Sequence, residues 1–498
     1  MTKTITKLHF NGVDYNIGGA WSLAEPTNIA VTTNGTTATI TWTDPEDLRT
    51  IPPTAFSKSV LVRKVGSEPT SPTDWTIVVE ETVRNTYKTS WYADTWLTSG
   101  TDYYYRVFTY ATTWIATYWD SAKTVRSRTF TVTFTETSSP SGFSPVYSDD
   151  AAWLAAWSTA FDDFFNYSAV KLSTAWVETA EVKQNAGVLD ITQLWSLSWW
   201  DNIMIKFPIM WIKMSKSGST VTLSITDDPS KASDGYQYYA HSRWTFDNPV
   251  IKNAFYMWVY EWYSSSNVLK SWSGQTPTAN QTMATFINYA RANDNNTWDA
   301  GYEICGFYQR QFINALYMMK YGNPDWQTTI GRGFVDWNSA AVSTWWTNSQ
   351  TNATYGESTG KQSMKLFGIE DWRWNVNDRI GWLCTDGSKN LWTALSWFVG
   401  DIKTTSPYAN QWTYSPWTSN PCISAIAWTN GAMFYPSATV SNGNYNTYWC
   451  DYGYVFASRL AYAGGTWVNG SDAGAFRLDV NVSASNAYAD LGARLMFL

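Results

Sequence analysis

The sequence predicts a multidomain protein in which an all-β domain precedes a larger α+β region. The chain has 498 residues, which corresponds to about three domains at roughly 150 residues each. Hydrophobic residues make up 44% and charged residues 15%, as in a folded chain and unlike a disordered acidic one. Short β-branched and aromatic runs fill residues 24–136, whereas helical periodicity appears only later in the chain.

Charge and composition exclude several classes of partner and site. The net charge of −7 and the pI near 5.0 argue against nucleic acid as a partner. With two His and four Cys, we expect no metal site, no cofactor and no disulfide scaffold. The opening residues MTKTITKLHF lack the apolar core of a signal peptide, and no apolar run is long enough to span a membrane. We therefore expect no membrane insertion.

Tryptophan is the abnormal residue of this chain, with 33 Trp against 30 Gly. Trp96, Trp199–Trp200 and Trp345–Trp346 lie in turn-like or polar segments. Turns favour residues that tolerate positive φ, which Trp does not. We hypothesise that many of these Trp are recoded UGA codons, written as Trp here but read as Gly in the source cell. A Trp-rich surface built for ligand stacking is the alternative. Three tryptophans lie in contexts where Trp belongs: Trp42, Trp449 and Trp467.

The N-terminal third predicts a leader followed by a β-sandwich. Residues 1–22 form a polar leader or attachment segment that resembles the opening segments of phage tail and fibre proteins. Roughly seven short strands between residues 24 and 136, separated by turn signals such as Asn34-Gly35, indicate a sandwich. The run from Trp96 to Tyr110 resembles the Leu-then-Tyr corner of fibronectin type III domains. That resemblance implies a fibronectin type III-like module that spaces and presents other domains.

The central part predicts a linker and then an α+β domain. Residues 137–184 are assigned as a linker, with a helix-like stretch over 151–170 and Asp149 or Asp150 as its candidate N-cap. From about 185 onward, strands are predicted over 202–210 and 220–226. Helices are predicted over 282–293 and 302–323, each with one apolar face.

Three motifs in residues 185–498 carry a resemblance. They are FYMWVYEW (255–262), KLFGIEDWRWNVNDRIGWL (365–383) and GGTWVNGSDAGAF (464–476). Together they resemble the C-type-lectin-like domain of formylglycine-generating proteins and of the variable proteins of diversity-generating retroelements. In that pattern Gly stands where this chain has Trp258, Trp262 and Trp374, as the recoding hypothesis predicts.

The same resemblance leaves an enzyme as an alternative. Formylglycine-generating oxidases use Cys residues near the C-terminal core, but this chain has none between Gly464 and Leu498. Cys305, Cys384, Cys422 and Cys450 are dispersed in the sequence, without a C-x-x-C motif. We therefore predict no catalytic residues and no enzymatic activity. Asp227–Asp228, and Asp371 with Asp378, are weaker candidates for cation ligands, because solvated carboxylates are commoner.

The segment from Phe434 to Leu495 has an unusual composition. Its 62 residues contain no Lys, Glu, Gln or Met, whereas the preceding 433 residues contain 52 of these four types. Adenine-directed mutagenesis of Asn codons yields codons ending in C or T, which encode none of these residues and no Trp. We therefore predict a variable region over about 444–490, in which Trp449 and Trp467 match constant aromatics of the family. A β-rich segment that disfavours Lys and Glu is the alternative.

The predicted ligand-binding residues are those that alternate with the constant framework of this region. They are Tyr445, Thr447, Tyr448, Asp451, Tyr452, Tyr454, Phe456, Ser458, Tyr462, Thr466, Val468, Asp472, Arg477 and Asp479. Tyr offers a large amphipathic contact area with few torsions to freeze, and Asp, Ser, Thr and Arg add adaptable polar contacts. We expect Trp467, Phe476 and Leu478 to point inward instead.

The sequence thus predicts a receptor-binding protein with a C-terminal surface diversified by adenine-directed mutagenesis. Its partner would be a protein or glycan on a target cell surface, and its location a virion tail or a cell surface. We also consider a homo-oligomer such as a trimer. The alternatives are the oxidase and an undiversified structural phage fibre head.

Overall fold

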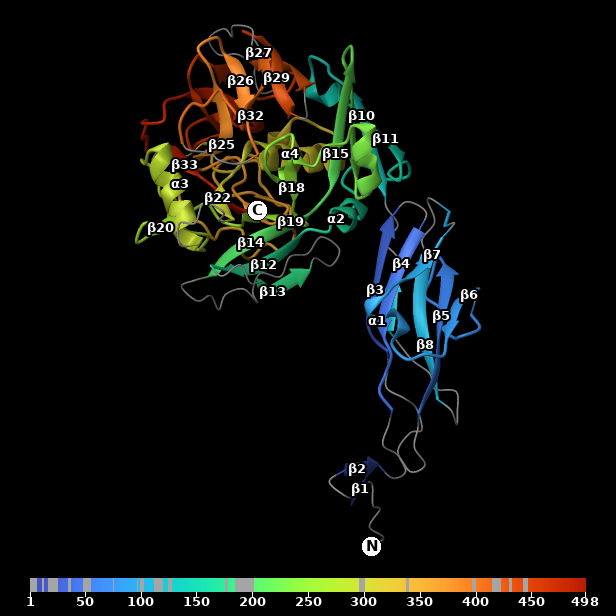
Figure 1. Ribbon diagram of the computed structural model, residues 1–498. Helices are drawn as coiled ribbons and strands as arrows, with labels where there is room; N and C mark the ends of the chain where they lie inside the picture. The colour runs from blue at the N-terminus through green and yellow to red at the C-terminus, as the bar shows by residue number, and fades with distance from the viewer. Residues whose placement is uncertain are drawn as a thin grey trace. The chain divides into compact units, whose positions relative to one another are not determined.

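A computed structural model of the chain divides into two compact units. The smaller contains residues 1–128 with Asp228–Ser230, and the larger contains residues 129–227 and 231–498. Figure 1 traces the smaller unit in blue. The structure describes residues 7–10, 13–16, 26–34, 37–47, 55–74, 76–95, 97–98, 103–111, 120–123, 128–174, 178–183, 201–294, 301–336, 340–395, 400–413, 422–429, 432–441 and 447–498.

The smaller unit holds a short hairpin and two antiparallel sheets. The hairpin pairs β1 (Lys7–Phe10) with β2 (Val13–Asn16). One sheet has the order β3 (Thr27–Asn34), β4 (Thr37–Thr43), β7 (Tyr92–Asp94). The other has the order β6 (Thr76–Glu81), β5 (Phe56–Val65), β8 (Tyr103–Ala111), β9 (Asp120–Lys123), and a short helix α1 (Thr86–Thr89) precedes β7.

Alternation along the strands builds the core of this unit. In β4 every second side chain is buried, which brings Ala38, Ile40 and Trp42 into one cluster with Tyr105 of β8. The indole N–H of Trp42 donates to Asp44 at 2.9 Å, so this buried Trp has its polar atom satisfied. The expected all-β organisation of this part of the chain is confirmed.

The larger unit begins at Thr129, earlier than the predicted start at 185. Strand β10 (Thr129–Thr135) pairs with β16 (Thr220–Thr226), so residues assigned to the sandwich up to 136 belong to the second unit. The predicted linker also contains ordered elements of this unit. Within residues 151–170 only α2 (Ala160–Phe165) is an α-helix, and its N-cap is Thr159. Asp149 and Asp150 instead accept hydrogen bonds from residues of β10.

Three larger sheets organise this unit. The first has the order β11 (Val146–Asp149), β10, β16, β15 (Trp211–Ser217). The second has the order β13 (Glu178–Lys183), β12 (Ser168–Ser173), β14 (Asp201–Pro208), β19 (Ala254–Trp258), β34 (Leu495–Phe497), β22 (Tyr302–Ile304). The third has the order β27 (Ala409–Thr413), β26 (Asn390–Thr393), β25 (Asn377–Thr385), β31 (Leu460–Gly464), β32 (Gly474–Val482), β30 (Gly453–Val455), and β33 (Leu491–Ala493) also pairs with β25.

Four hairpins and short helices complete the larger unit. The hairpins are β17 (Ser242–Trp244) with β18 (Pro249–Ile251), β20 (Tyr263–Ser265) with β21 (Val268–Lys270), β23 (Lys365–Leu366) with β24 (Ile369–Glu370), and β28 (Cys422–Thr429) with β29 (Ala432–Val440). The helices are α3 (Met283–Arg291), α5 (Trp326–Thr329) and the 3₁₀ turns η1 (Pro140–Gly142), η4 (Tyr239–His241), η5 (Ala292–Asp294) and η6 (Gly470–Asp472); η3 (Pro229–Asp234) includes residues of both units.

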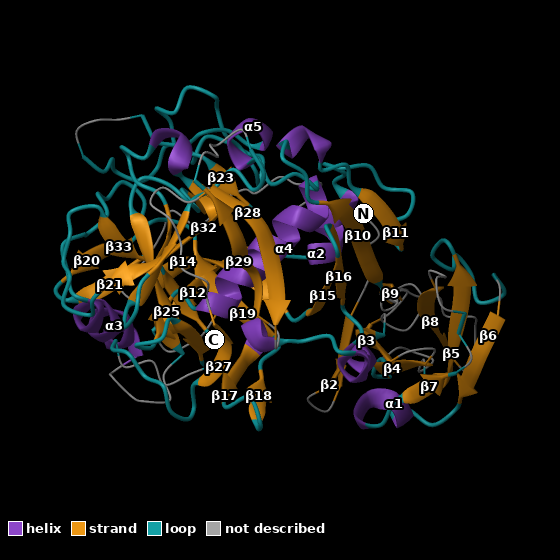
Figure 2. Cartoon of the chain, turned by 90° about the horizontal axis from the view of Figure 1, so that it is seen from above, coloured by secondary structure: helices purple, strands orange, loops and turns teal. Residues whose placement is uncertain are grey.

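Helix α4 (Phe307–Tyr321) lies in the middle of the larger unit, among its strands (Figures 1 and 2). All of its residues are buried, so the prediction of a helix with a single apolar face is wrong. Two of its charged side chains lie near opposite charges within the core: Lys320 pairs with Asp162 of α2 at 2.5 Å, and Arg310 lies 3.6 Å from Asp378 of β25. The helix begins after Gly306, later than expected, because Tyr302–Ile304 is a strand of the second sheet. No described helix has the length and apolar character of a membrane span.

Candidate binding surface

The third sheet of the larger unit has one core face and one polar face. On the core face, Ile380, Ala461, Ala463, Leu478 and Val480 join the main hydrophobic cluster. Because neighbouring residues of a strand point to opposite faces, the residues between them point the other way. They form what we call the polar face: Asn377 and Arg379 of β25, Tyr462 of β31, Arg477, Asp479 and Asn481 of β32, and Tyr454 of β30.

A row of directly paired residues crosses the polar face. Tyr454 is opposite Asp479, Asp479 is opposite Tyr462, and Tyr462 is opposite Arg379. Residues paired between antiparallel strands, here Arg379 with Tyr462 and Tyr462 with Asp479, have Cβ atoms roughly 4.5–5.5 Å apart, whereas Tyr454 and Asp479 are neighbours in a parallel ladder. The row therefore unites three candidate residues, Tyr454, Tyr462 and Asp479, that are separated in the sequence.

A buried ion pair supports this row. Nε of Arg477 donates to Asp479 at 2.8 Å, and the guanidinium carbon of Arg477 lies 6.0 Å from the ring centre of Tyr462. Burial opposes the charge of Arg477, but the carboxylate of Asp479 outweighs it and raises the pKa of the guanidinium. Burial raises the pKa of Asp479, while Arg477 lowers it. Such a pair holds side chains in place, and removing one partner would leave an uncompensated charge.

Tyrosines recur at every second position along the edge strand β30. Tyr452, Tyr454 and Phe456 therefore point to one side, whereas Gly453 and Val455 are buried. Tyr452 is also an electrostatic neighbour of Asp472, because burial and that carboxylate both raise the pKa of Tyr452. We call Tyr452, Tyr454, Phe456, Tyr462 and Asp472 the tyrosine patch. Phe456 is 51% exposed, and the other four are half-buried.

The remaining candidate residues divide by exposure. Val468 is exposed, whereas Thr447, Tyr448 and Ser458 are half-buried. Tyr445 lies outside the described residues. Phe476 and Leu478 are buried as expected, and Trp467 is half-buried instead.

Four candidates are buried, so their assignment to an exposed surface is wrong: Asp451, Thr466, Arg477 and Asp479. Each makes a local polar contact. Asp451 accepts the backbone N–H of Phe476 at 2.7 Å, and both the N–H and the hydroxyl of Thr466 bond to Asn469, at 2.7 and 3.0 Å. Burial raises the pKa of Asp451 to about 7. The chemical variety of the candidate residues therefore did not show which of them are exposed and which are buried.

The carboxylates proposed as cation ligands have protein partners instead. Asp378 lies 3.3 Å from Arg494 and 3.6 Å from Arg310, and Asp371 accepts a hydrogen bond from Ser363 at 2.9 Å. Within the described ranges, no three His, Cys, Asp or Glu side chains gather as metal ligands would.

All four cysteines are buried free thiols. The structure brings Cys422 near Cys450, close enough for the charge of one to raise the pKa of the other. Burial raises the pKa of both thiols further. A protonated thiol is a weak nucleophile and a weak metal ligand, so the pair lacks the electropositive setting of a reactive cysteine.

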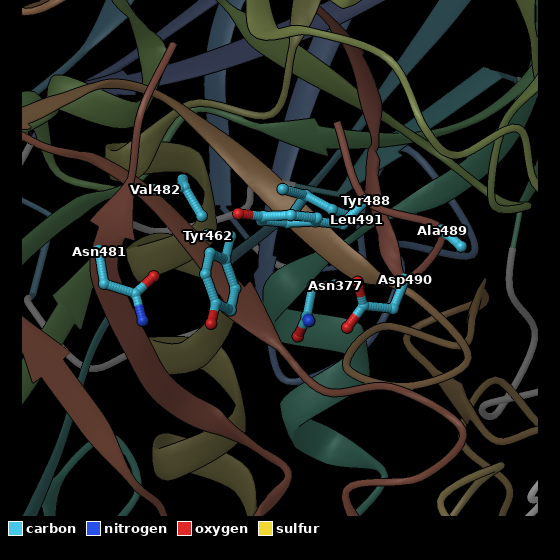
Figure 3. Close-up of a pocket in the computed structure, with 8 residues that line it drawn as sticks. All are labelled: Asn377, Tyr462, Asn481, Val482, Tyr488, Ala489, Asp490 and Leu491. Atoms are coloured by element: carbon cyan, nitrogen blue, oxygen red, sulfur yellow. The ribbon is translucent and has the colours of Figure 1, made fainter. Parts of the chain in front are cut away.

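A pocket of about 570 Å³ opens beside the polar face and was missed by the sequence predictions (Figure 3). Its lining residues come from β25, β31, β32, β33 and the segment before β33: Asn377, Tyr462, Asn481, Val482, Tyr488, Ala489, Asp490 and Leu491. Only Tyr462 was a candidate residue. The parallel pairing of β25 with β33 joins the two halves of this pocket, and no local sequence pattern signals such a pairing.

Comparisons of the chain with protein-family models and with curated proteins gave no match.

Proposed function

We propose that this chain binds a target, a protein or glycan on a cell surface, through the tyrosine patch of its C-terminal domain. The observation that carries the proposal is that candidate residues separated in the sequence are paired across one face of the third sheet. The segment that lacks Lys, Glu, Gln and Met also supplies every residue of the patch. Adenine-directed diversification accounts for the composition, and a rigid sheet that presents Tyr side chains accounts for binding without a large ordering cost.

The two faces of the third sheet support the proposal, because binding residues lie on the polar face and core residues on the other. Core residues such as Ala463, Leu478 and Val480 alternate with the polar-face residues, so side chains on one face can change while the core stays intact. We propose a C-type-lectin-like domain for this part of the larger unit. In this proposal Arg477 and Asp479 form a support beneath the patch, and ligand contact comes from the tyrosines.

The smaller unit is proposed as a fibronectin type III-like spacer. Its sheets contain three and four strands, in the orders β3-β4-β7 and β6-β5-β8-β9. The hydroxyl of Tyr103 accepts the backbone N–H of Thr98 at 3.0 Å, five residues upstream, which has the form of a tyrosine corner. A spacer in front of a binding domain suits a virion tail or a cell-surface protein, and in either setting several copies, such as a trimer, would add avidity.

Two experiments test the proposal. Sequencing of the surrounding locus is expected to find a near-identical repeat of the 434–495 coding segment that differs at adenines. In a binding assay on target cells, the double variant Tyr452→Ala/Tyr454→Ala should lose on the order of 2 kcal/mol or more of binding free energy. Tyr263→Ala, a half-buried tyrosine of β20, is the matched control. Absence of the repeat together with unchanged binding of the double variant would reject the proposal and favour an undiversified fibre head.

The juxtaposed Cys422 and Cys450 make the oxidase the second candidate. We expect no formylglycine product from thiol-containing sulfatase peptides, because both thiols are held in the protonated form. Product formation that is lost in Cys450→Ser would establish the oxidase instead.

A further inference from the structure

Backbone hydrogen bonds hold two polar residues of the pocket, Asn377 and Asp490, in place. Asn377, at the start of β25, is 5% exposed, and its backbone N–H donates to the carbonyl of Asp490 at 3.0 Å. Asn377 also pairs with Leu491 of β33, so the strand ladder holds its position. In Figure 3 its amide and the carboxylate of Asp490 lie side by side at one end of the pocket.

The amide oxygen of Asn377 has no hydrogen-bond partner among the residues that the structure describes. A buried acceptor left without a donor costs roughly 1–3 kcal/mol. Because Asn377 lines the pocket, a ligand that donates a hydrogen bond there would satisfy this atom. The pocket is therefore built for a ligand that carries hydroxyl or N–H donors.

Two aromatic rings join Val482, Ala489 and Leu491 in the lining of the pocket. Tyr488 is 50% exposed, but its main chain is anchored: its carbonyl accepts the N–H of Asn280 at 2.9 Å and that of Leu491 at 3.1 Å. Its hydroxyl accepts the side-chain N–H of Asn486 at 2.9 Å. Tyr462 is the second ring, and Figure 3 shows it between Asn481 and Asn377. An anchored, exposed ring offers a flat face for stacking at little entropic cost.

The charge of the pocket selects among ligands. Asp490 is the one ionisable carboxylate in the lining, and the other polar groups are two amides and two phenols. Burial raises the pKa of Tyr462, so its hydroxyl stays neutral, and this hydroxyl is hydrogen-bonded to the side chains of Asn481 and Asp479. An aromatic face beside an amide oxygen and a carboxylate matches the C–H face and the hydroxyls of a sugar ring. The volume lies within the roughly 300–1,000 Å³ of small-molecule sites.

We propose that the pocket formed by Asn377, Tyr462, Asn481, Tyr488 and Asp490 binds one neutral sugar unit of a target glycan. The Asn377 amide oxygen and the Asp490 carboxylate accept sugar hydroxyls, and the Tyr488 ring packs against the C–H face. The proposal deepens the proposed target binding by assigning a ligand class to a site that shares Tyr462 with the tyrosine patch, and it rests on that function.

A second pocket of the larger unit shows why the unpartnered acceptor matters. This pocket of about 730 Å³ includes Gln327, Arg332 and Asp336. There the amide N–H of Gln327 donates to the carbonyls of Gly470 and Ala473, its oxygen accepts from Arg332, and Arg332 pairs with Asp336. Its polar groups satisfy one another, so it offers no comparable demand for a ligand.

The test is saturation-transfer NMR of the full chain with methyl glycosides of glucose, galactose, mannose, fucose and N-acetylglucosamine. At least one glycoside should bind with a Kd of about 10 mM or tighter, as expected for a single small contact site. Tyr488→Ala and Asn377→Leu should each weaken that binding by about tenfold or more. Tyr263→Ala should leave the affinity unchanged. Absence of saturation transfer for all five glycosides, or undiminished affinity in Tyr488→Ala, would overturn the proposal.

A competing ligand separates sugar from peptide recognition. Nα-acetyl-lysine methylamide carries an ammonium group that could pair with Asp490. If this compound binds, the glycosides do not, and Asp490→Asn abolishes the binding, the pocket recognises a basic side chain and the sugar proposal is wrong. Thermal unfolding of Asn377→Leu shows whether its loss of binding reflects unfolding, and Tyr488→Ala, at an exposed ring, gives the same comparison without a core change.

The two proposals fail separately. Tyr452→Ala/Tyr454→Ala lies outside the pocket, so this variant should keep glycoside binding while losing the target. If it keeps the target, the tyrosine patch is not the binding surface, although the pocket can still bind sugar. If Tyr488→Ala keeps glycoside affinity, the pocket proposal alone fails.

Discussion

Buried tryptophans of the larger unit differ in whether their indole N–H has a hydrogen-bond partner. Around Trp449, the indole N–H donates to Glu136 at 2.9 Å, and the ring packs edge-on against Phe476 with 5.0 Å between centres. Elsewhere in the core of this unit, the indole N–H groups of Trp258, Trp262 and Trp374 are buried without a partner among the described residues. Burial alone is thus no sign that a Trp belongs at a position, because its N–H must also be satisfied.

For these five tryptophans the hydrogen-bond contrast follows the division made from the sequence, whereas Trp326 and Trp382, which the sequence did not single out, also have buried indole N–H groups without a partner among the described residues. Trp42 and Trp449 were assigned as true tryptophans, and both donate to a carboxylate. Trp258, Trp262 and Trp374 were assigned to Gly positions, and none of the three has a partner for its N–H in the described structure. Backbone geometry adds to the contrast: Trp157, Trp345 and Trp382 have φ of 74°, 121° and 60°. Such values suit Gly and are strained for a bulky side chain.

The largest expected effect is on composition. Peptide mass spectrometry of protein from its native source should show Gly at Trp96, Trp258, Trp262, Trp345 and Trp374, because turns or family positions call for Gly there. Trp96 lies outside the described residues, so its test is chemical only. Trp42 and Trp449 serve as internal controls and should remain Trp. Detection of Trp at all five sites would remove the recoding hypothesis.

In protein that carries Trp at both positions, truncation of Trp449 should lower the free energy of unfolding more than truncation of Trp374. Trp449→Ala leaves a cavity against Phe476, so the free energy of unfolding should fall by about 3–5 kcal/mol in a denaturant titration. Trp374→Gly also leaves a cavity in the core, but it removes a buried indole N–H without a partner, so its cost should be smaller than that of Trp449→Ala by about 1–3 kcal/mol. An equal loss of unfolding free energy in the two variants would contradict the distinction between Trp449 and Trp374.

Acid should destabilise the larger unit through His241. Burial between Phe255 and Phe312 lowers the pKa of His241 to about 3, from an ordinary value near 6.5. Below pH 6.5 the unfolded chain binds a proton that the folded chain does not. Stability is therefore fully present above pH 6.5 and falls toward pH 3, by up to about 1.4 kcal/mol per pH unit.

Urea titrations at several pH values measure this slope, and His241→Phe is expected to flatten it. Asp451 acts in the opposite sense, because its raised pKa makes its contribution decline as pH rises toward 7. An unchanged slope in His241→Phe would show that carboxylates alone set the acid response.

The smallest expected effect is at an exposed pair. Trp345 and Trp346 are adjacent, stacked and similarly exposed, but only Trp345 has positive φ. Trp345→Gly should raise the free energy of unfolding by about 1–3 kcal/mol, because it releases backbone strain. Trp346→Gly is the matched control and should not stabilise, since Gly adds entropy to the unfolded chain. Thermal unfolding of the two variants compares them directly; a shift of the same sign and size in both would contradict the strain argument.

Local elements were largely predictable from sequence. The strands over 202–210 and 220–226 and the helix over 282–293 correspond to β14, β16 and α3, and Thr282 caps α3 by accepting the N–H of Thr285. The helix expected over 151–170 was wrong except at Ala160–Phe165: the residues before it form turns and loop, and the last three belong to a strand. Ser168–Ser173 became β12, which pairs with β13 and β14 in the second sheet.

The candidate site was predictable in part. Alternation along Tyr452, Tyr454 and Phe456 is a local pattern, and it placed these side chains on one side of a strand. Asp451 and Asp479 were wrong as surface residues, because burial depends on what packs over a position. Asn377 could not be predicted as a pocket residue for the same reason, because its place in the pocket depends on pairing with Leu491, which lies far away in the sequence.

By itself, the sequence determined the β-rich multidomain class, the periodicity of individual strands and the segment that lacks Lys, Glu, Gln and Met. These properties depend on neighbouring residues, whose side-chain spacing and backbone preferences act locally. Only the tertiary structure decided that β10 joins the larger unit, that α4 is buried on every side, and that Asn377, Tyr462 and Tyr488 share a pocket. Those outcomes depend on hydrogen bonds and packing between segments far apart in the chain. The sequence of a single strand does not specify which other strand pairs with it.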